Sequence, residues 1–431
     1  MLEMGEIIIE ATLYKQYCKI LQDELRMATG CTEPIAIAYC AAKARSLLDS
    51  YPQSVEIFVS GNIIKNVKSV VVPNTGGMKG IKVAAAAGIV AGDSGKMLQV
   101  ICNVCDEQRE KIKEFLEKTP VSVDKLDCKE ALEILVKLYG DNESSSVRIS
   151  GFHTNIVAME HNGETVELPK ISNCEESPKK DYSCLTISRI CEFADSLNIE
   201  DVKECLDRQI KCNTAIANEG LVGDWGAQIG KILMKRNDSS LRNRAKAMAA
   251  AGSDARMSGC ELPVVINSGS GNQGLTVSLP VIEYFKASGK SEDMLYRSLV
   301  VSNLCSIHAK SKIGELSAYC GAVTAGSAAA AGIAYLMTKD PKVVAHTLVN
   351  SLAITSGIIC DGAKPSCAAK IAIAVDSGLL GLEMYLNGSE FYGGDGVLSK
   401  GIENTLDNIG TLGSKGMKQL DKMILEIMLE E

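Results

Sequence analysis

The segment from Cys320 to Cys367 constrains the fold of this chain most strongly, because it combines a run of very small residues with three thiols. Residues 321–332, directly after Cys320, are nearly all Gly, Ala, Ser and Thr. Such a run suits a helix whose backbone packs closely against its neighbours. The second thiol-bearing part, Cys360-Asp-Gly-Ala-Lys-Pro-Ser-Cys367, contains the Gly and Pro of a tight loop. The pattern predicts a closely packed helical core with a thiol-bearing loop beside it.

The three thiols admit two interpretations. Cysteine is among the most buried residue types, so Cys320, Cys360 and Cys367 could simply pack in a core, as others of the 16 cysteines would. Alternatively, two thiols on one loop and one at a helix start could meet, and three thiolates could hold an iron–sulfur cluster with one iron open to substrate. The spacing matches neither of the common ferredoxin patterns, so the residues alone leave both interpretations open.

Composition narrows the class of protein. The chain has 431 residues, of which 46% are hydrophobic, and this is enough for a large core and for more than one domain. A net charge of −8 argues against nucleic acid or an anionic membrane as partner. No run of eighteen apolar residues and no basic leader are visible, so we expect neither a membrane span nor a signal peptide. Many cysteines without a small disulfide framework predict a cytoplasmic protein. The partner that we expect is a small-molecule substrate.

Hydrophobic periodicity divides the chain into a helical and a mixed part. Residues 97–172 alternate between strand-like runs and charged helical segments, including a predicted helix over 130–139. Asn162-Gly163 within this block is a strong hairpin signal. A polar linker follows at 173–183, and beyond it the pattern is helical. We therefore predict a mainly α catalytic domain with small β elements, formed by 1–96 and 173–431, plus an inserted α+β domain formed by 97–172.

Polar groups gather at three predicted helix starts. Cys31, Thr32 and Glu33 precede a helix predicted from Ile35, and the dipole of that helix would favour the thiolate of Cys31. Two glycine-rich loops also lead into helices, where backbone N–H groups can bind an anion. The first contains Asn74, Thr75, Gly76 and Lys79, and the second contains Ser268, Gly269 and Asn272. Neither has the spacing of a nucleotide-binding loop, so they suit a carboxylate, unless they are plain tight turns.

Five segments, in this order, are similar to those of the L-cysteine desulfidase family, which is related to the iron–sulfur L-serine dehydratases. They are Gly30 to Pro34, Val72 to Gly80, Ser268 to Gly274, Ala318 to Ala322 and Cys360 to Cys367. The resemblance implies an oxygen-sensitive enzyme with a 4Fe–4S cluster and no pyridoxal phosphate (PLP). It would convert L-cysteine to sulfide, ammonia and pyruvate by way of aminoacrylate.

The same resemblance implies roles for individual residues. Cys320, Cys360 and Cys367 would bind the cluster, and Cys31 lies where the dehydratases carry a catalytic His-Thr motif, which makes it the candidate base. In a rival assignment Cys31 replaces Cys367 as the third ligand. We favour the first, because a short loop brings two ligands together at little entropic cost. Lys79 and His308 are further catalytic candidates, and the predicted substrate-binding residues are Thr32, Glu33, Asn74, Thr75, Gly76, Ser268, Gly269 and Asn272.

Two other functions stay open at this point. The same elimination could act on serine or another small amino acid, because the sequence does not show which leaving atom fits. A non-catalytic cluster protein that senses iron, oxygen or cysteine is the alternative from a different class, although no DNA-binding motif supports it. An alanine-rich helical core often contains a subunit interface, so a homodimer is also possible.

Overall fold

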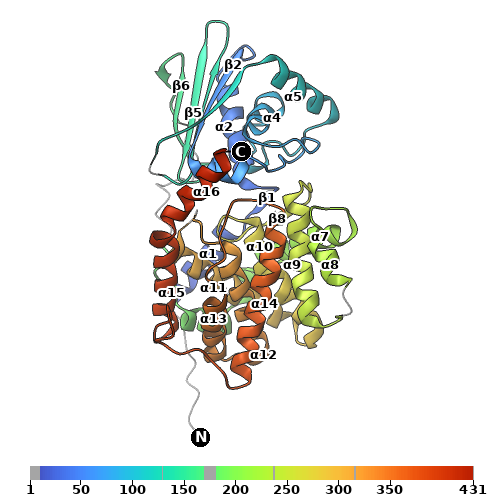
Figure 1. The fold of residues 1–431 in the computed structure, drawn as a ribbon, viewed down its shortest axis with the longest axis vertical. Coiled ribbons are helices and arrows are strands. Elements are labelled where there is room, and N and C mark those ends of the chain that lie inside the picture. The colour runs from blue at the N-terminus through green and yellow to red at the C-terminus, as the bar shows by residue number, and fades with distance from the viewer. Residues whose placement is uncertain (1–9, 129, 169–180, 236–237, 315–316, 431) are drawn as a thin grey trace.

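The computed structural model describes residues 10–128, 130–168, 181–235, 238–314 and 317–430. It has a helical part and an α+β part, which are stacked along the long axis of the molecule (Figure 1). Each part has its own hydrophobic core: one joins residues between Tyr17 and Ala28 to residues 185–409, and the other joins residues 35–159 to Leu425.

Small residues build the centre of the helical part. Its longer helices are α1 (Ala11–Glu24), α6 (Ile187–Ser196), α7 (Lys203–Val222), α8 (Ile229–Met234), α9 (Leu241–Met257), α10 (Gly271–Ser288), α11 (Glu292–Ile313), α12 (Gly321–Thr338), α13 (Pro341–Thr355), α14 (Cys367–Leu386) and α15 (Ile402–Thr411). Helix α12 packs against α10, α11, α13 and α14. A methyl group on Gly326 would lie 2.5 Å from the backbone of Ala374, so α12 and α14 approach as closely as the sequence predicts.

Helix α12 is also the one helix, among the described residues, that is long and apolar enough to cross a membrane. However, 83% of its 18-residue window is buried inside the protein. Burial by neighbouring helices accounts for its composition, as expected for the central helix of a packed bundle.

The α+β part surrounds one twisted sheet. Its elements are α2 (Thr32–Arg45), β2 (Ser54–Val59), α3 (Gly61–Val67), α4 (Ile81–Ala91), a 3-10 turn (Met97–Gln99), α5 (Asp106–Lys118), β3 (Val121–Lys125), β4 (Glu133–Tyr139), β5 (Ser144–Ser150), β6 (Ile156–His161) and β7 (Glu164–Thr165). The strand order is β3-β2-β4-β5-β6-β7, in which β2 and β3 are parallel and the other pairs antiparallel.

Two predictions for this part need correction and one is confirmed. The α+β part is larger than 97–172, because β2 lies inside the sheet and α2 and α4 belong to the same core. The predicted helix over 130–139 is strand β4, whose alternate residues Ile134, Val136 and Leu138 are buried. The hairpin is confirmed: Asn162 and Gly163 join β6 to β7 with φ angles of 53° and 80°.

Two further elements join the parts. Strand β1 (Met27–Thr29) lies just before α2 and pairs with β8 (Pro263–Val265), which lies just before α10. Near the other end of the described chain, α16 (Lys418–Glu430) crosses from the helical part to pack on α3 (Figure 1). There the buried ammonium group of Lys65 pairs with Asp421. The starts of α2, α3 and α10 are therefore held close to the junction between the two parts.

Candidate active site

Two of the predicted ligand cysteines flank a short backbone ladder. The N–H of Cys320 donates to the carbonyl of Ile358 at 3.2 Å, and the N–H of Cys360 donates to the carbonyl of Ala318 at 2.6 Å. Between these bonds, Tyr319 and Ile359 form an isolated antiparallel bridge. Segments forty residues apart in the sequence therefore lie side by side, and Cys320 caps the start of α12.

Contacts with α3 fix the loop from Cys360 to Cys367. Gly362 has a φ of 95°, and a methyl group there would lie 2.4 Å from the carbonyl oxygen of Lys65. The ammonium group of Lys364 donates to the same oxygen at 3.3 Å. Cys367 begins α14, and its sulfur accepts a hydrogen bond from the N–H of Lys364 at 3.4 Å. A left-handed glycine and one carbonyl thus set the shape of the loop.

The three thiols form one electrostatic group. Burial, and then the charge of Cys360, raises the pKa of Cys320 to about 12, and Cys367 adds to this effect. Burial also raises the pKa of Cys367, and the charge of Cys360 again contributes. Since each thiolate disfavours the next, these cysteines would not ionise together without a cation to compensate them.

This donor set fits an iron–sulfur cluster. Thiolates are soft ligands that favour iron–sulfur clusters and zinc. No three Cys, His, Asp or Glu side chains among the described residues are arranged to hold a single metal ion. In a four-iron cluster each thiolate binds a different iron, so its ligands need not converge on one point. The helix starts at Cys320 and Cys367 add positive potential that would favour an anionic cluster.

Cys31 lies at the start of α2 and bonds to a carboxylate. Its thiol, which is 4% exposed, donates to Glu33 Oε2 at 2.9 Å. Glu33 also accepts hydrogen bonds from the hydroxyl of Thr32 at 3.2 Å and from the amide of Asn66 at 3.1 Å. Thr32, Glu33 and Cys31 are therefore brought together, as the sequence predicts for one loop, and Asn66 joins them from α3.

The protonation of this pair differs from the prediction. Burial, followed by the charge of Glu33, raises the pKa of Cys31 well above its ordinary value. Burial by itself would raise the pKa of Glu33, but the charge of His153 and the hydrogen bond from Cys31 keep that pKa below its ordinary value. The free protein therefore holds a Cys31 thiol and a Glu33 carboxylate. The sequence predicts that the helix dipole favours the Cys31 thiolate, but in the free protein burial and the neighbouring Glu33 anion outweigh that contribution.

The first glycine-rich loop uses its polar side chains to hold its own shape. The amide of Asn74 donates to the carbonyl of Ile101 at 2.8 Å, and the hydroxyl of Thr75 donates to that of Val72 at 2.7 Å. Gly76 lies near the Arg109 side chain, and Lys79 is exposed. The loop nevertheless starts next to the Cys31 segment, since Pro73 lies against Gly30. Its backbone, rather than these side chains, is what remains available to a ligand.

The second glycine-rich loop contacts the Cys31 segment directly. The carbonyl of Gly269 accepts a hydrogen bond from the hydroxyl of Thr32 at 3.4 Å. Ser268 donates to the side chain of Asn267 at 2.9 Å, and Asn272 accepts from the guanidinium of Arg256 at 3.2 Å. This loop therefore faces the same region as the thiols, and it brings with it a buried cation.

His308 occupies a different place from the thiols. Its Nε2 lies 2.6 Å from Glu403 Oε2, between α11 and α15, and its side chain is 2% exposed. Glu403 in turn accepts from the N–H of Ile187 at the start of α6, at 2.8 Å. Within the described part of the chain, no contact joins His308 to Cys31 or to the thiol loop. These contacts favour a structural role, and the catalytic role of His308 stays a prediction.

Sequence reasoning missed four residues of the site. Arg256, Asn66, Lys364 and His153 face the Cys31–Glu33 pair or the thiol loop. The signal for Arg256 was weak, because α9 carries several other charged residues. Lys364 lies within the thiol loop itself. Asn66 and His153 are brought to Glu33 by long-range packing, from α3 and from the segment after β5.

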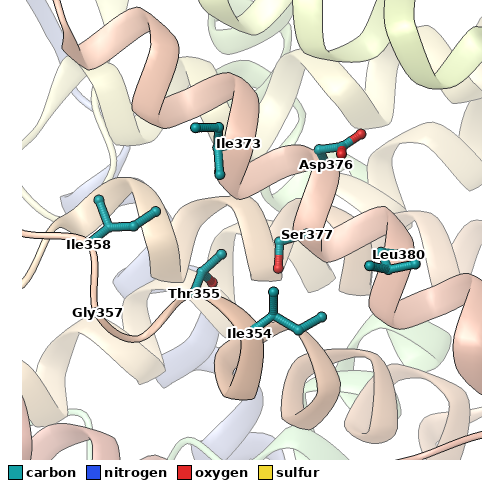
Figure 2. A pocket seen from close by; sticks show the side chains of 8 residues that line it. All are labelled: Ile354, Thr355, Gly357, Ile358, Ile373, Asp376, Ser377 and Leu380. Atoms are coloured by element: carbon teal, nitrogen blue, oxygen red, sulfur yellow. The ribbon is translucent and has the colours of Figure 1, made fainter.

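The molecule also has an open groove of about 370 Å³ between α13 and α14. Figure 2 shows its lining, which includes Ile354, Ile358, Ile373 and Leu380. None of the predicted site residues lines it. The groove therefore lies outside the candidate active site, although Ile358 belongs to the segment that leads to Cys360.

Comparison with known proteins places this arrangement in a family. Residues 95–426 match the family model described as serine dehydratase alpha chain. The chain belongs to the serine dehydratase alpha chain family. The matched range includes Cys320, Cys360 and Cys367, as well as Arg256, but it does not include Cys31. The family assigns the chain to the iron–sulfur amino-acid dehydratase type of lyase, and it implies a 4Fe–4S cluster and no PLP.

Similar chains cover the whole length. A UPF0597 protein of Desulfitobacterium hafniense is 54% identical over 418 residues, which is 97% of each chain. A UPF0597 protein of Finegoldia magna is 47% identical over 420 residues, covering 97% of this chain and 100% of its own. One from Lachnoclostridium phytofermentans is 46% identical over 417 residues, again covering 97% and 100%. These relatives therefore extend the likeness to the Cys31 segment.

Proposed function

We propose that this protein is an L-cysteine desulfidase, which eliminates sulfide from L-cysteine to give ammonia and pyruvate by way of aminoacrylate. We further propose that Cys320, Cys360 and Cys367 bind the 4Fe–4S cluster. The observation that carries the proposal is the placement of a thiol–carboxylate pair beside a group of three coupled thiols. Lys364 interacts with both groups. Burial lowers its pKa, while the charges of Asp361, Cys367 and Cys31 raise it.

The elimination needs help at the leaving group, at the α-proton and at the carboxylate. When bound, the cluster would supply an open, soft iron that acts as a Lewis acid for the departing sulfur. The proton of Cys31 can pass to Glu33 Oε2, 2.9 Å away, which leaves a thiolate to remove the α-proton. Thr32 and Asn66 hold the Glu33 carboxylate in place for that transfer. Burial of Cys31 keeps water from the thiolate.

The grouping of the thiols supports this assignment over the rival one. The charges that act on Cys320 include those of Cys360 and Cys367, whereas those that act on Cys31 include Glu33 and Arg256. A base should be paired with a proton acceptor, and a ligand should face the other ligands. By this criterion Cys31 is the base and Cys367 is the third ligand.

The test is iron and sulfide analysis of anaerobically prepared protein, together with sulfide release from L-cysteine. We expect about four irons per chain in the wild type and in Cys31→Ala, and few in Cys367→Ala or Cys320→Ala. Cys31→Ala should lose turnover. Iron loss in Cys31→Ala with iron retained in Cys367→Ala would reverse the assignment. A loaded wild type that binds L-cysteine without releasing sulfide would instead indicate a sensor.

Serine is the second candidate substrate, because the family model is that of a serine dehydratase. The two differ in the leaving atom: a thiolate is a soft ligand and a good leaving group, whereas a hydroxyl must be protonated as it leaves. Comparing kcat/KM for L-cysteine and L-serine on the same preparation separates them. We expect L-cysteine to be preferred, and a preference for L-serine would contradict the proposal. We place the reaction in the cytoplasm, since all the described cysteines are free thiols.

A further inference from the structure

Arg256 is a buried cation with unused hydrogen-bonding capacity. It lies in the last turn of α9 and is 5% exposed. Its Nη1 donates to Asn272 Oδ1 at 3.2 Å, but its Nε has no hydrogen-bond partner among the described residues. Among the described residues it forms no salt bridge, although its charge acts on the carboxylate of Glu33. Because a guanidinium has five N–H donors, a buried one with an unpartnered Nε keeps donors available for a ligand.

Close packing fixes where the guanidinium lies. A methyl group on Gly271 would lie 2.3 Å from Arg256 Nε, so the guanidinium is placed against the first residue of α10. Gln273, two residues further along α10, is also 5% exposed, and its Oε1 has no hydrogen-bond partner in the described part of the chain. A methyl group on Gly321 would lie 2.9 Å from Gln273 Nε2. Gln273 therefore lies beside the start of α12, next to Cys320.

These groups lie next to both the Cys31 segment and the segment that begins at Cys320. The guanidinium bonds to Asn272, in the loop whose Gly269 carbonyl accepts a hydrogen bond from Thr32, the neighbour of the proposed base Cys31. The charge of Arg256 accordingly acts on both Cys31 and Glu33. On the other side, Gln273 contacts the residue that follows the proposed ligand Cys320. A molecule held by Arg256 would therefore lie between the base and the cluster thiols. A planar anion with two oxygens is the ligand that a guanidinium binds best.

We propose that Arg256 is the binding site for the α-carboxylate of an amino-acid substrate, and that the amide N–H of Gln273, rather than its Oε1 acceptor, assists it. The inference rests on the proposed function only in that the substrate is an amino acid. It gives the second glycine-rich loop a supporting role, because Asn272 orients the guanidinium and the short residues around it let the cation approach the helix start. Held in this way, a substrate presents its α-proton toward Cys31 and its β-substituent toward the cluster thiols.

Two small thiols test the proposal without turnover. 3-Mercaptopropionate has the carboxylate of cysteine but no amine, and cysteamine has the amine but no carboxylate. Their dissociation constants are measured by calorimetry on anaerobic, cluster-loaded protein. In Arg256→Gln we expect 3-mercaptopropionate to bind at least about tenfold more weakly and cysteamine to bind within about threefold of wild type. Arg256→Lys, which keeps the charge but loses the planar fork, should fall between the two.

The control is Arg244→Gln, since Arg244 is in the same helix but is 54% exposed and pairs with Glu283. It should leave both constants unchanged. The proposal is overturned if Arg256→Gln and Arg256→Lys weaken the binding of both thiols equally, or weaken neither. It is also overturned if the wild type does not bind 3-mercaptopropionate. If Arg256→Gln does not fold, as judged by circular dichroism and iron content, Arg256→Lys and Gln273→Leu decide the question by the same comparison. Loss of sulfide release with selective binding intact would refute the proposed reaction but not this site.

Discussion

Replacing His308 with alanine separates a structural role from a catalytic one. The imidazole is 2% exposed and bonds to Glu403, whose side chain is 37% exposed. A hydrogen bond to a charged group contributes about 1.5–3 kcal/mol. Glu403 can turn partly to water and keeps its bond to the N–H of Ile187, so the middle of that range applies. We expect His308→Ala to lower the free energy of unfolding by about 2 kcal/mol and to leave kcat nearly unchanged.

Denaturant unfolding of anaerobic protein and steady-state sulfide release measure the two effects. Lys312→Ala is the matched control, because Lys312 is in the same helix and its pair with Asp407 is largely exposed. It should cost less than about 1 kcal/mol. A fall in kcat of tenfold or more in His308→Ala, at unchanged stability, would refute the structural interpretation and restore His308 as a catalytic group.

The pH dependence of the same variant has a definite sign. Burial by itself would raise the pKa of Glu403, but the hydrogen bond from His308 holds that pKa below its ordinary value. A carboxyl group with a lowered pKa stabilises the fold above its ordinary pKa, and that stability is lost as the pH falls through the lowered value. The difference in stability between wild type and His308→Ala should therefore be full above about pH 5 and should narrow below it. A difference that widens in acid would contradict the assigned partner.

Three further changes test the loops around the site. Gly362→Ala forces a side chain into a left-handed conformation, which costs about 1–2 kcal/mol, and places it against the carbonyl of Lys65. The iron content per chain should therefore fall. In the control Gly357→Ala the new methyl group has open space, so the iron content should stay at the wild-type value. Lys65→Met leaves Asp421 without its partner, and limited proteolysis should then remove α16 faster than in the control Lys422→Met; equal rates would show that the pair does not hold this helix. Lys79→Ala should keep the KM for L-cysteine within about threefold, since the side chain is exposed, and a tenfold rise would return Lys79 to the substrate site.

Local chemistry made part of this structure predictable. The small residues after Cys320 predict a closely packed helix, and α12 is one. Asn162-Gly163 predicts a tight hairpin because both residues tolerate positive φ, and the turn between β6 and β7 has it. The polar residues at Cys31 to Glu33 predict a helix start, which is the start of α2. In each case the information lies within a few residues of the feature.

Long-range packing decided the rest. Residues 130–139 fit a helical and an alternating pattern equally well, and pairing of β4 with β2, far upstream, selected the strand. Lys79 and His308 have the residue types of catalytic groups, but only the folded chain shows that one side chain is exposed and that the other bonds to Glu403. Arg256 was missed for the converse reason: a helix pattern does not show that a cation turns toward a helix start elsewhere in the chain.

The covering of α3 by α16 has a consequence for biosynthesis. Lys65 supports the thiol loop through its carbonyl and pairs through its ammonium group with Asp421, a residue 356 positions later in the chain. At ordinary translation speeds, the ribosome needs on the order of 20–70 s to add that many residues. During that interval the cation lacks its counter-ion, and the helix beneath the thiol loop lacks its cover. Insertion of a cluster into a fully supported loop therefore follows the synthesis of Asp421.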